Sequence, residues 1–551
     1  MEKFTKKLLS ALLGATVLCS VACQPTPPPP PTDTGGGNYT PITDADFLTA
    51  NGTALYNADG EEVRLQGTNF GGWLHMEGWM DGGGGDYNHY AVLSALRARF
   101  TESETQELLK IYQDAFITET DVENVYSLGL NMIRVPFFWT EIMDDEGQIR
   151  EDAFYHLDWL TAECKKRGLY VLLDLHGAPG GHSSGWLTGG HTGSNELWSD
   201  EECQARTVRI WEALATHYKD EPTICGYGLL NEPVPPENSP LTTAAIYDRL
   251  YDAVRAIDSR HAVVLGAFFN FDALGSPESN GWTNVVYETH HYDDGNKTAE
   301  NQQNFVAGNL QYLRGYQQLW QVPILAGEFN FWSAEDAWRT WLYALNETGI
   351  SWSNWTYKHT DLERDNNWGL YYQPMVEKVD YARDSYDEIA RKWRGYATEN
   401  YTKNEFLTGI FTWATADNER VETAKTSFTA QAYQTDGDNA AKLLLDGDIF
   451  TRWSNCEVQG NGTNQWIEVD FGETLNLSGI GLFTWNNDYT RAYKVLADIE
   501  GEWRVIARGN GRFGRTEITF EPLLTEKIRV VQTGNADWNY WSVYELSFYT
   551  A

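Results

Sequence analysis

The sequence predicts an α/β fold in which a (β/α)8 TIM barrel is followed by an all-β sandwich. Between about residues 44 and 396, short apolar runs alternate with amphipathic helical segments, a pattern typical of βα units around a parallel sheet. After about residue 402 the helical periodicity disappears and short alternating runs replace it. Because 551 residues are too many for one hydrophobic core, two domains with additional tails are expected.

The N-terminus has the features of a targeting segment. Three lysines precede an apolar run, residues 8–17, that is too short to span a bilayer as a mature helix. The run leads to Ser20-Val21-Ala22-Cys23, which resembles a bacterial lipobox. We therefore interpret residues 1–23 as a lipoprotein signal peptide with Cys23 as the lipidated residue. Cleavage as an ordinary signal peptide, followed by secretion, is the alternative.

Residues 24–38 are predicted to form a linker after this anchor. The segment contains the run Pro27–Pro31 and three successive glycines, a composition that favours an extended spacer. The protein is therefore expected to be exported and held at a bacterial cell surface or in the periplasm. The N-terminal lipid anchor is its only expected contact with a membrane.

The chain is strongly acidic, with a formal net charge of −37 at pH 7. This charge repels nucleic acid, and no basic stripe interrupts it, so nucleic acid is excluded as a partner. Four cysteines follow Cys23 without a CxxC pair or a Cys/His cluster. The sequence therefore predicts no zinc site, and no cofactor is expected for catalysis.

The first domain is predicted to extend over residues 39–398. A pair of short strands near residues 51 and 60 is expected to close the bottom of the barrel. The eight candidates for barrel strands are Val63–Asn69, Met132–Phe138, Tyr170–Leu175, Gly226–Leu230, Val263–Phe268, Val285–Thr289, Ile324–Gly327 and Ile350–Trp355. A doubly wound parallel sheet is the weaker alternative.

Polar and aromatic residues stand where several of these strands end. In a parallel barrel, side chains at the carboxyl ends of the strands converge on one rim, where catalytic residues lie. A lone glutamate there is weak evidence, but six strands that each deliver such a residue indicate an active site. The residues are Arg134, His176, Asn231, Glu232, His290, Tyr292, Glu328 and Trp355.

Two glutamates on opposed barrel strands suit glycoside hydrolysis. One carboxyl protonates the leaving oxygen while the other attacks the anomeric carbon, across a gap of about 5–5.5 Å in the retaining reaction. The acid needs a raised pKa and the nucleophile a depressed one, and Arg134 is the candidate for keeping the nucleophile ionised. We expect Asn231 to bind the sugar 2-hydroxyl and Tyr292 to donate a hydrogen bond to the nucleophile. Trp355 is expected to stack on the reacting sugar.

Most of residues 60–360 resembles glycoside hydrolase family 5, the retaining (β/α)8 family also called cellulase family A. The segment GYGLLNEP is similar to the acid/base strand of that family and assigns this role to Glu232. The segment ILAGEFNFW is similar to the nucleophile strand and assigns Glu328. The resemblance further implies substrate contacts for Arg134, His176, Asn231, His290, Tyr292 and Trp355.

Within the family, LQGTNFGGWLHMEGWM and AFITETDVENVYSLGLNMIRVPFFW resemble the exo-β-1,3-glucanase branch. This likeness implies that Glu77 contacts the terminal sugar in a closed pocket. The expected substrate is therefore a β-glucan, β-1,3-linked and cut from the chain end. An endo-β-1,4-glucanase or another β-glycanase of the same family is the alternative.

Residues 410–551 are predicted to form the second domain. The segments AAKLLLDGDIFTRWSN, QWIEVDFGE and WSVYELSFY resemble the discoidin type, also called the factor 5/8 C-terminal type, a jelly-roll sandwich that includes carbohydrate-binding module family 32. The resemblance implies a structural calcium ion held by Asp446, Asp448, Thr451 and Glu545. Aromatic residues in turn-rich stretches are the candidates for sugar binding, namely Trp485, Trp538, Tyr540 and Trp541.

Three function classes compete for the whole chain. A retaining β-glycoside hydrolase uses both glutamates and all their supporting residues. A transglycosylase would use the same residues and differ only in the access of water. A non-catalytic glycan-binding surface protein would have no need of both glutamates, so the sequence favours the hydrolase.

Overall fold

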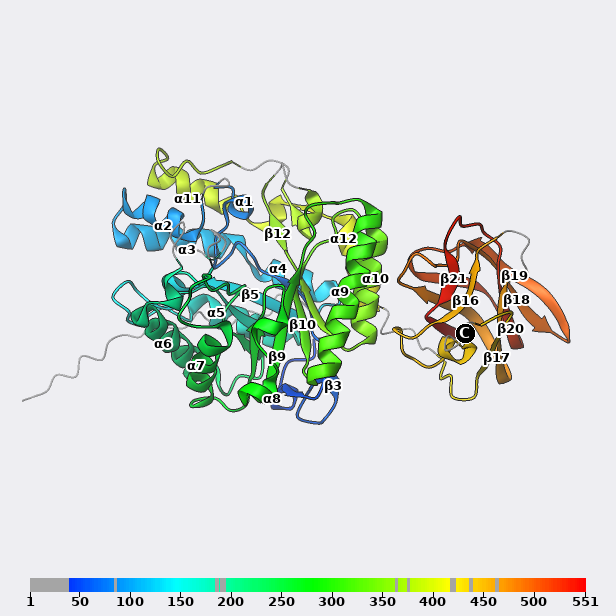
Figure 1. The fold of residues 1–551 in the computed structure, drawn as a ribbon. Helices are drawn as coiled ribbons and strands as arrows, with labels where there is room; N and C mark the ends of the chain where they lie inside the picture. Colours follow the sequence, from blue (N-terminus) through cyan, green and yellow to red (C-terminus); the bar gives the residue numbers. More distant parts are fainter. Residues whose placement is uncertain are drawn as a thin grey trace, which may run out of the picture.

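The computed structural model describes residues 39–83, 87–183, 188, 195–361, 365–373, 377–416, 423–435, 440–460 and 465–551. The predicted signal peptide, its Cys23 and the predicted linker lie outside the described residues. Figure 1 shows a barrel surrounded by helices, followed along the chain by a β-sandwich. No helix within the described ranges is both long and apolar enough to span a membrane.

The first domain is a closed barrel of eight parallel strands in the order β10-β11-β4-β5-β6-β7-β8-β9. Closure confirms the predicted (β/α)8 barrel and excludes a doubly wound sheet. The predicted strands are all found, with ends that differ by a few residues. They are β4 (Gln66–Asn69), β5 (Met132–Phe138), β6 (Tyr170–Gly177), β7 (Ile224–Gly228), β8 (Ala262–Gly266), β9 (Val285–His291), β10 (Ile324–Phe329) and β11 (Ser351–Asn354).

Helices cover the outside of the barrel because each turns one apolar face inward. In α6, Ile210, Trp211 and Leu214 are fully buried on one face. Asp200 caps this helix by accepting the main-chain N–H groups of residues 202 and 203. The outer helices are α3 (Glu102–Phe116), α4 (Glu119–Ser127), α5 (Tyr155–Arg167), α6 (Glu201–Tyr218), α7 (Thr243–Arg255), α8 (Pro277–Asn280), α9 (Ala299–Trp320) and α10 (Glu335–Glu347).

A small antiparallel sheet covers the bottom of the barrel. It consists of β1 (Thr49–Asn51), β2 (Ala54–Tyr56) and β3 (Glu62–Val63). Leu55 of β2 belongs to the same apolar cluster as the buried Met132 and Tyr170 at the starts of β5 and β6. The predicted pair of short strands is therefore a sheet of three, in the expected place.

Helix α12 (Glu405–Ala416) packs on the barrel although it follows the predicted end of that domain at residue 398. Its Phe411 is fully buried, with ring centroids 6.0 Å from Trp338 and 5.6 Å from Trp352. The Asn346 side chain of α10 also donates to the Ala414 carbonyl at 3.0 Å. The barrel core thus continues to the end of α12, and residue 410 lies inside this helix.

The top of the barrel carries further short elements that frame the site. They are α1 (Gly78–Asp81), α2 (His89–Arg97), β12 (Lys358–His359), β13 (Tyr371–Tyr372), α11 (Tyr386–Arg394) and β14 (Thr402–Lys403). Lys358 of β12 is fully buried, and its ammonium donates to the Tyr396 carbonyl at 3.0 Å and to Thr398 Oγ1 at 2.7 Å. It thereby ties the top of the barrel to the chain that leads into α12.

The second domain is an antiparallel sandwich, as predicted. Its larger sheet has the order β15-β17-β20-β18-β19, with β22 paired to β17, and β16 pairs with β21 in a second sheet. The strands are β15 (Thr429–Ala432), β16 (Trp453–Val458), β17 (Trp466–Thr484), β18 (Ala492–Ile499), β19 (Glu502–Asn510), β20 (Gly514–Gln532), β21 (Tyr540–Val543) and β22 (Glu545–Thr550).

Two of the four aromatic residues predicted to bind sugar are buried. Trp541 is fully buried in the sandwich core, with its ring centroid 4.9 Å from that of Trp453. Trp485 is 4% exposed and donates its indole N–H to the Ile449 carbonyl at 2.8 Å. The prediction that Trp485 and Trp541 bind sugar is therefore wrong, because both side chains are buried in hydrophobic packing. Trp538 and Tyr540 are 87% and 42% exposed and stay available for it.

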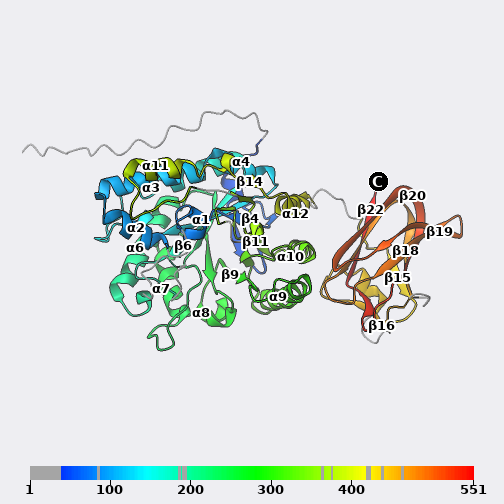
Figure 2. The same cartoon turned by 90° about the horizontal axis from the view of Figure 1, so that it is seen from above.

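Helix α10 is one of the barrel helices that face the sandwich, as Figures 1 and 2 both show. The ring centroid of Tyr343 lies 4.7 Å from that of Phe483, and the Arg515 guanidinium lies 4.3 Å above the Tyr343 ring. Asp336 pairs with Arg512. The two domains therefore contact each other through apolar packing with an ion pair beside it.

Candidate active site

A cavity of about 420 Å³ opens at the carboxyl ends of the barrel strands. Seven of the nine predicted catalytic and substrate-binding residues line it. The remaining two, Arg134 and His290, are buried and contact its carboxylates. The lining residues are Glu77, Trp79, His176, Asn231, Glu232, Phe268, Phe269, Tyr292, Asp294, Glu328, Trp355 and Trp368.

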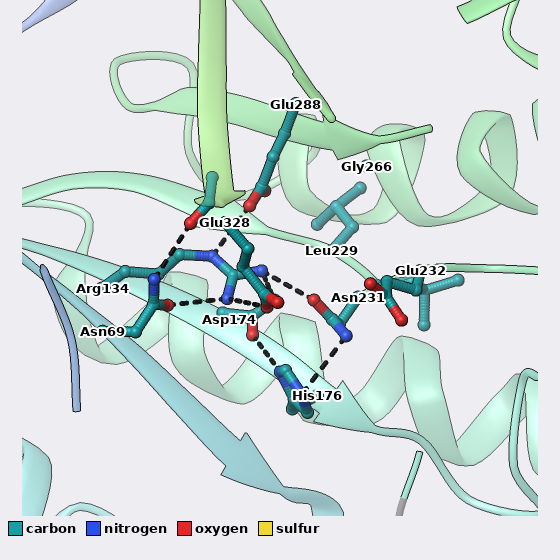
Figure 3. Close-up of polar contacts among 12 residues, drawn as sticks. Asn69, Arg134, Asp174, His176, Leu229, Asn231, Glu232, Gly266, Glu288 and Glu328 are labelled. Carbon is teal, nitrogen blue, oxygen red and sulfur yellow. Dashed lines mark hydrogen bonds and ion pairs between the residues drawn. The ribbon is translucent and has the colours of Figure 1, made fainter. Parts of the chain in front are cut away.

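The two predicted catalytic carboxylates face each other across this cavity. Glu328 lies in β10 and Glu232 follows β7, and one carboxylate oxygen of each lies within 4.8 Å of the other. Glu232 has a main-chain φ of 45°, in the left-handed region. Figure 3 shows both side chains with their supporting residues.

Arg134 of β5 is fully buried beneath the nucleophile position and pairs with three carboxylates. Its Nη1 lies 3.1 Å from Glu328 Oε1, its Nη2 3.1 Å from Asp174 Oδ1 and its Nε 2.8 Å from Glu288 Oε1. Burial alone would lower the pKa of Arg134, but these charges raise it above its ordinary value. The guanidinium is therefore a fixed positive charge beside Glu328 (Figure 3).

His290 lies between the Glu232 and Glu328 carboxylates. Its Nδ1 lies 2.6 Å from Glu232 Oε1 and 3.5 Å from Glu328 Oε2, and its Nε2 lies 3.4 Å from Glu288 Oε1. Burial acts to lower the pKa of His290, but the three carboxylates outweigh it and raise the pKa to about 10. A protonated imidazole therefore lies between the two catalytic side chains.

The pKa of Glu328 differs from the depressed value that was expected for the nucleophile. Burial raises this pKa to about 7, while the charges of His290 and Arg134 oppose the rise. The Tyr292 hydroxyl, which donates to Glu328 Oε2 at 2.9 Å, also opposes it. The supporting groups thus act in the expected direction, and burial exceeds their combined effect.

His176 and Asn231 hold each other in place. His176 Nδ1 lies 2.7 Å from Asp174 Oδ2, so the ring donates there and its Nε2 can accept from Asn231 Nδ2 at 3.3 Å. Asn231 Oδ1 in turn accepts from Arg134 at 2.8 Å. Burial lowers the pKa of His176 well below its ordinary value, so the ring is neutral. The amide of Asn231 is therefore fixed in orientation.

Aromatic residues and Glu77 form part of the wall of the cavity. Glu77 is 2% exposed, and its Oε2 accepts the indole N–H of Trp79 at 2.7 Å. Trp355 lies over the His176 ring, with centroids 5.3 Å apart and planes 13° apart. The rings of the wall belong to one buried cluster, which contains Trp79, Trp332, Trp355 and Trp368, with Tyr292 packed against it.

Three partners of Arg134 escaped the sequence analysis, namely Asn69, Asp174 and Glu288. Asn69 Oδ1 accepts from Arg134 Nη1 at 2.9 Å, and the two acids pair with the same guanidinium. Asp174 and Glu288 are single acids that follow apolar residues inside fully buried strands, each two residues before a predicted histidine. A charged residue in a buried strand was the signal that could have revealed them.

Two groups of described residues have the composition of a metal site. They are His75 with Glu77 and His176, and His290 with Glu232 and Glu328. In the second group the histidine is protonated and bonds directly to the carboxylates, which disfavours its use as a ligand. Each group includes two residues that line the catalytic cavity.

The predicted calcium ligands lie together in the sandwich. Thr451 Oγ1 donates to Asp446 Oδ2 at 2.7 Å, Asp448 Oδ1 accepts a main-chain N–H of the same loop at 3.0 Å, and so does Glu545 Oε2 at 3.0 Å. Glu545 also pairs with the Lys425 ammonium. Carboxylate and hydroxyl oxygens are the donors that calcium prefers, so the set fits this ion chemically.

Comparisons with known proteins agree with this geometry. Residues 93–361 match the family model of cellulase (glycosyl hydrolase family 5), and residues 423–546 match that of the F5/8 type C domain. A β-xylosidase of Phanerodontia chrysosporium is 36% identical over 45% of this chain and 52% of its own length.

Two further relatives are named for other activities. A probable glucan 1,3-β-glucosidase A of Aspergillus clavatus is 30% identical over 41% of this chain and 55% of its own. Endoglucanase C of Acetivibrio thermocellus is 31% identical over 35% of this chain and 54% of its own length. The chain thus spans about half the length of the curated relatives it matches. Over residues 93–361 the chain thus carries a glycosyl hydrolase family 5 domain, and over residues 423–546 an F5/8 type C domain.

Proposed function

We propose that this protein is a retaining β-glycoside hydrolase that cleaves β-linked glucan by double displacement. The observation that carries the proposal is the approach of the Glu232 and Glu328 carboxylates to within 4.8 Å in one cavity. This approach suits the separation of about 5–5.5 Å in retaining enzymes and is shorter than the roughly 6.5–9.5 Å of inverting ones.

In the first step Glu328 attacks the anomeric carbon and Glu232 gives its proton to the leaving oxygen. The carbon–oxygen bond to the leaving group breaks as the bond to Glu328 forms, which yields a covalent glycosyl-enzyme. The Tyr292 hydroxyl and the Arg134 guanidinium hold the two oxygens of Glu328 from different sides, so its attacking orientation is fixed.

In the second step Glu232, now a carboxylate, removes a proton from water, and the water oxygen attacks the same carbon. Glu328 leaves with its electron pair, and two inversions restore the β configuration. The Asn231 amide, fixed by His176 and Arg134, is placed to bind the sugar 2-hydroxyl, where a hydrogen bond strengthens in the transition state.

The proposed substrate is a β-1,3-glucan that is cut from its end. The presence of Glu77, Trp79 and Trp368 in the cavity wall supports the exo mode, because they offer a terminal sugar a polar contact and aromatic faces. The glucan 1,3-β-glucosidase among the relatives supports the linkage. An endo-β-1,4-glucanase is the second candidate, supported by Endoglucanase C among the relatives.

The first test is a panel of β-1,3-glucan, β-1,4-glucan, β-xylan and their short oligomers, with released and transferred sugars separated by chromatography. Single glucose units from β-1,3-glucan are the expected product, and longer products from β-1,4-glucan would favour the second candidate. Proton NMR of the early product should show the β-anomer first. An initial α-anomer would contradict the retaining mechanism, and no product with any glycan would favour a binding protein.

We further propose that the sandwich binds a glycan surface through Trp538 and Tyr540, and that Asp446, Asp448, Thr451 and Glu545 hold a calcium ion. Calcium would crosslink the loop of residues 446–451 to β22 and stabilise the module by linkage. A melt of the full chain should shift downward with chelator and recover with added calcium. An unchanged melt would contradict the calcium site.

Export and anchoring through Cys23 complete the proposal. The basic and apolar start of the chain, followed by the lipobox-like Ser20–Cys23 segment, supports them. Labelling of cells with a fatty-acid analogue should mark the protein, and Cys23→Ala should abolish the label. Label that persists in the variant would contradict lipidation at this residue.

A further inference from the structure

The acid/base residue has an unusual main chain. Glu232 has a φ of 45°, which is uncommon for a residue with a Cβ and persists only where the surroundings impose it. Its carboxylate contacts His290 at 2.6 Å and otherwise faces the cavity. The position of this carboxylate therefore depends on what holds the backbone around it.

One buried histidine holds that backbone on both sides. His182, in the loop after β6, is fully buried, and its Nε2 donates to the main-chain carbonyl of Asn231, the residue before Glu232. The carbonyl of His182 accepts the main-chain N–H of Val234, two residues after Glu232, at 3.0 Å. Together these two bonds bracket the strained residue.

His182 is itself fixed from two directions. Its Nδ1 accepts the Ala178 N–H at 3.4 Å, and the indole N–H of Trp198 donates to its carbonyl at 3.0 Å. Because Nδ1 accepts, the ring proton resides on Nε2, where the Asn231 carbonyl requires it. Burial lowers the pKa of His182 to about 4, so this neutral form persists near neutral pH.

We propose that His182 is a positioning residue of the reaction, which sets the place of the Glu232 carboxylate by holding the main chain before and after it. The inference rests on the proposed function of Glu232. It predicts a specific defect, because a misplaced acid matters most where the leaving group needs protonation. The nucleophile, on β10, does not depend on His182.

The test compares His182→Ala and His182→Gln with the unchanged chain on aryl β-glycosides whose phenols differ in acidity. The glycone is the one that the unchanged enzyme hydrolyses. For His182→Ala, kcat/KM on the phenyl glycoside should fall by about 10- to 100-fold, and on the dinitrophenyl glycoside by far less. His182→Gln, whose amide N–H can still reach the Asn231 carbonyl, should recover part of the loss on the phenyl glycoside.

His261→Ala is the matched control. His261 is also buried, and its Nε2 contacts the main-chain carbonyl of Glu221 at 3.1 Å, on the outside of the barrel away from the cavity. This variant should lose thermal stability without a change in leaving-group dependence. Equal losses on both glycosides for the two His182 variants, or the same leaving-group dependence in His261→Ala, would overturn the positioning role.

If His182→Ala does not fold, His182→Gln alone provides the test. Its loss of kcat/KM should be larger on the phenyl glycoside than on the dinitrophenyl glycoside, and equal losses would overturn the positioning role. A chain that is inactive before any substitution on every glycoside would instead contradict the proposed function itself. The two failures are therefore separate observations.

Discussion

Residues in the cavity act through the charges of their neighbours. Two cations, Arg134 and His290, face four buried carboxylates, of which Glu288 and Glu328 contact both. The excess of negative charge favours a retained proton among the carboxyls, which is what acid catalysis requires. Because the groups titrate together, removing one charge should change the protonation of the others.

Glu288→Gln tests this coupling. Glu288 helps to raise the pKa of His290 to about 10, so its loss should lower that pKa. Charged His290 contributes stability that is complete below its ordinary pKa of 6.5 and lost as the pH rises through about 10. In the variant this loss should be smaller and complete at lower pH, and the alkaline limb of kcat/KM should move to lower pH as well. Melting temperatures and rates between about pH 6 and pH 10 measure both.

The control for this variant is Glu278→Gln, at an exposed glutamate of α8. It removes the same charge far from the two cations and should leave the pH profile unchanged. An alkaline limb at the same pH in Glu288→Gln and in the unchanged chain would contradict the coupling.

The two glutamates should differ in their response to the leaving group. Glu328→Ala should abolish turnover of every glycoside, because no glycosyl-enzyme can form. Glu232→Ala should retain part of its activity on dinitrophenyl glycosides, whose leaving group needs little protonation, while turnover of natural glycans falls by about 10²–10⁴-fold. Steady-state rates on both substrates distinguish the variants, and equal losses would contradict the assigned roles.

The sequence predicted the two catalytic carboxylates better than the acids that support them. Glu232 follows β7 and Glu328 is the second-last residue of β10, and the C-terminal rim of a parallel barrel is a defined place for chemistry. Asp174 and Glu288 were missed because an apolar run with one acid does not show which cation the barrel brings to it. For Trp541 the turn-rich surroundings predicted exposure, whereas β16 and β21 enclose it.

At the scale of elements, Gly327 of β10, the residue before Glu328, leaves room for the Glu288 side chain of the neighbouring strand β9. A Cβ on Gly327 would lie 1.9 Å from Glu288 Oε1 and 2.6 Å from its Cδ. The absence of a side chain there lets the Glu288 carboxylate pass under β10 to reach Arg134 and His290. The glycine in ILAGEFNFW therefore serves the charge network through the packing of two strands.

Gly327→Ala should displace Glu288 and so impair both stability and catalysis. Overpacking of this kind costs about 1–3 kcal/mol of unfolding free energy, and the alkaline limb of the pH profile should shift as in Glu288→Gln. Denaturant unfolding and rate measurements check the two effects. Unchanged stability and an unchanged pH profile in Gly327→Ala would show that Glu288 has room to move.

A second glycine gives the opposite expectation. Gly308 lies on the exposed side of α9, and no atom lies within 4 Å of a Cβ placed there. Gly308→Ala should therefore stabilise the protein by about 0.5–1 kcal/mol, because alanine loses less chain entropy in a helix. The activity of Gly308→Ala should equal that of the unchanged chain. Comparison with Gly327→Ala therefore distinguishes crowding at β10 from a general effect of adding a methyl group.

Elements were predictable from periodicity as long as they belonged to the repeating βα pattern. Helix α12 lies after the last βα unit, where the sequence pattern had already changed to the short alternating runs of the sandwich. The boundary predicted for the second domain, residue 410, therefore fell inside this helix. Its place was decided by Phe411 entering the barrel core beside Trp338 and Trp352. Contacts this distant along the chain have no local signal.

At the scale of the whole molecule, the sandwich is fixed to the barrel through α10. A Cβ on Gly514 of β20 would lie 1.9 Å from Thr340 Oγ1, so the two main chains approach closely where Tyr343 meets Phe483 and Arg515. Apolar packing of this kind resists relative motion better than an ion pair alone. We therefore expect the two domains to unfold together and not independently.

Truncations at two positions separate the contribution of each domain. A chain that ends after Ala416 keeps every residue of the cavity and all of α12, so it should retain its kcat/KM on soluble oligosaccharides. It should melt at a lower temperature, because the Tyr343 face of α10 becomes exposed.

A chain that ends after Tyr396 also loses Leu407, Ile410 and Phe411, all buried. Losing such side chains costs about 2–5 kcal/mol each, which together approaches the roughly 5–15 kcal/mol that stabilises a domain. This shorter chain should not fold, as circular dichroism and activity would show. Loss of activity in the longer chain would mean that the sandwich helps to shape the cavity, and a folded shorter chain would mean that α12 is dispensable for the barrel.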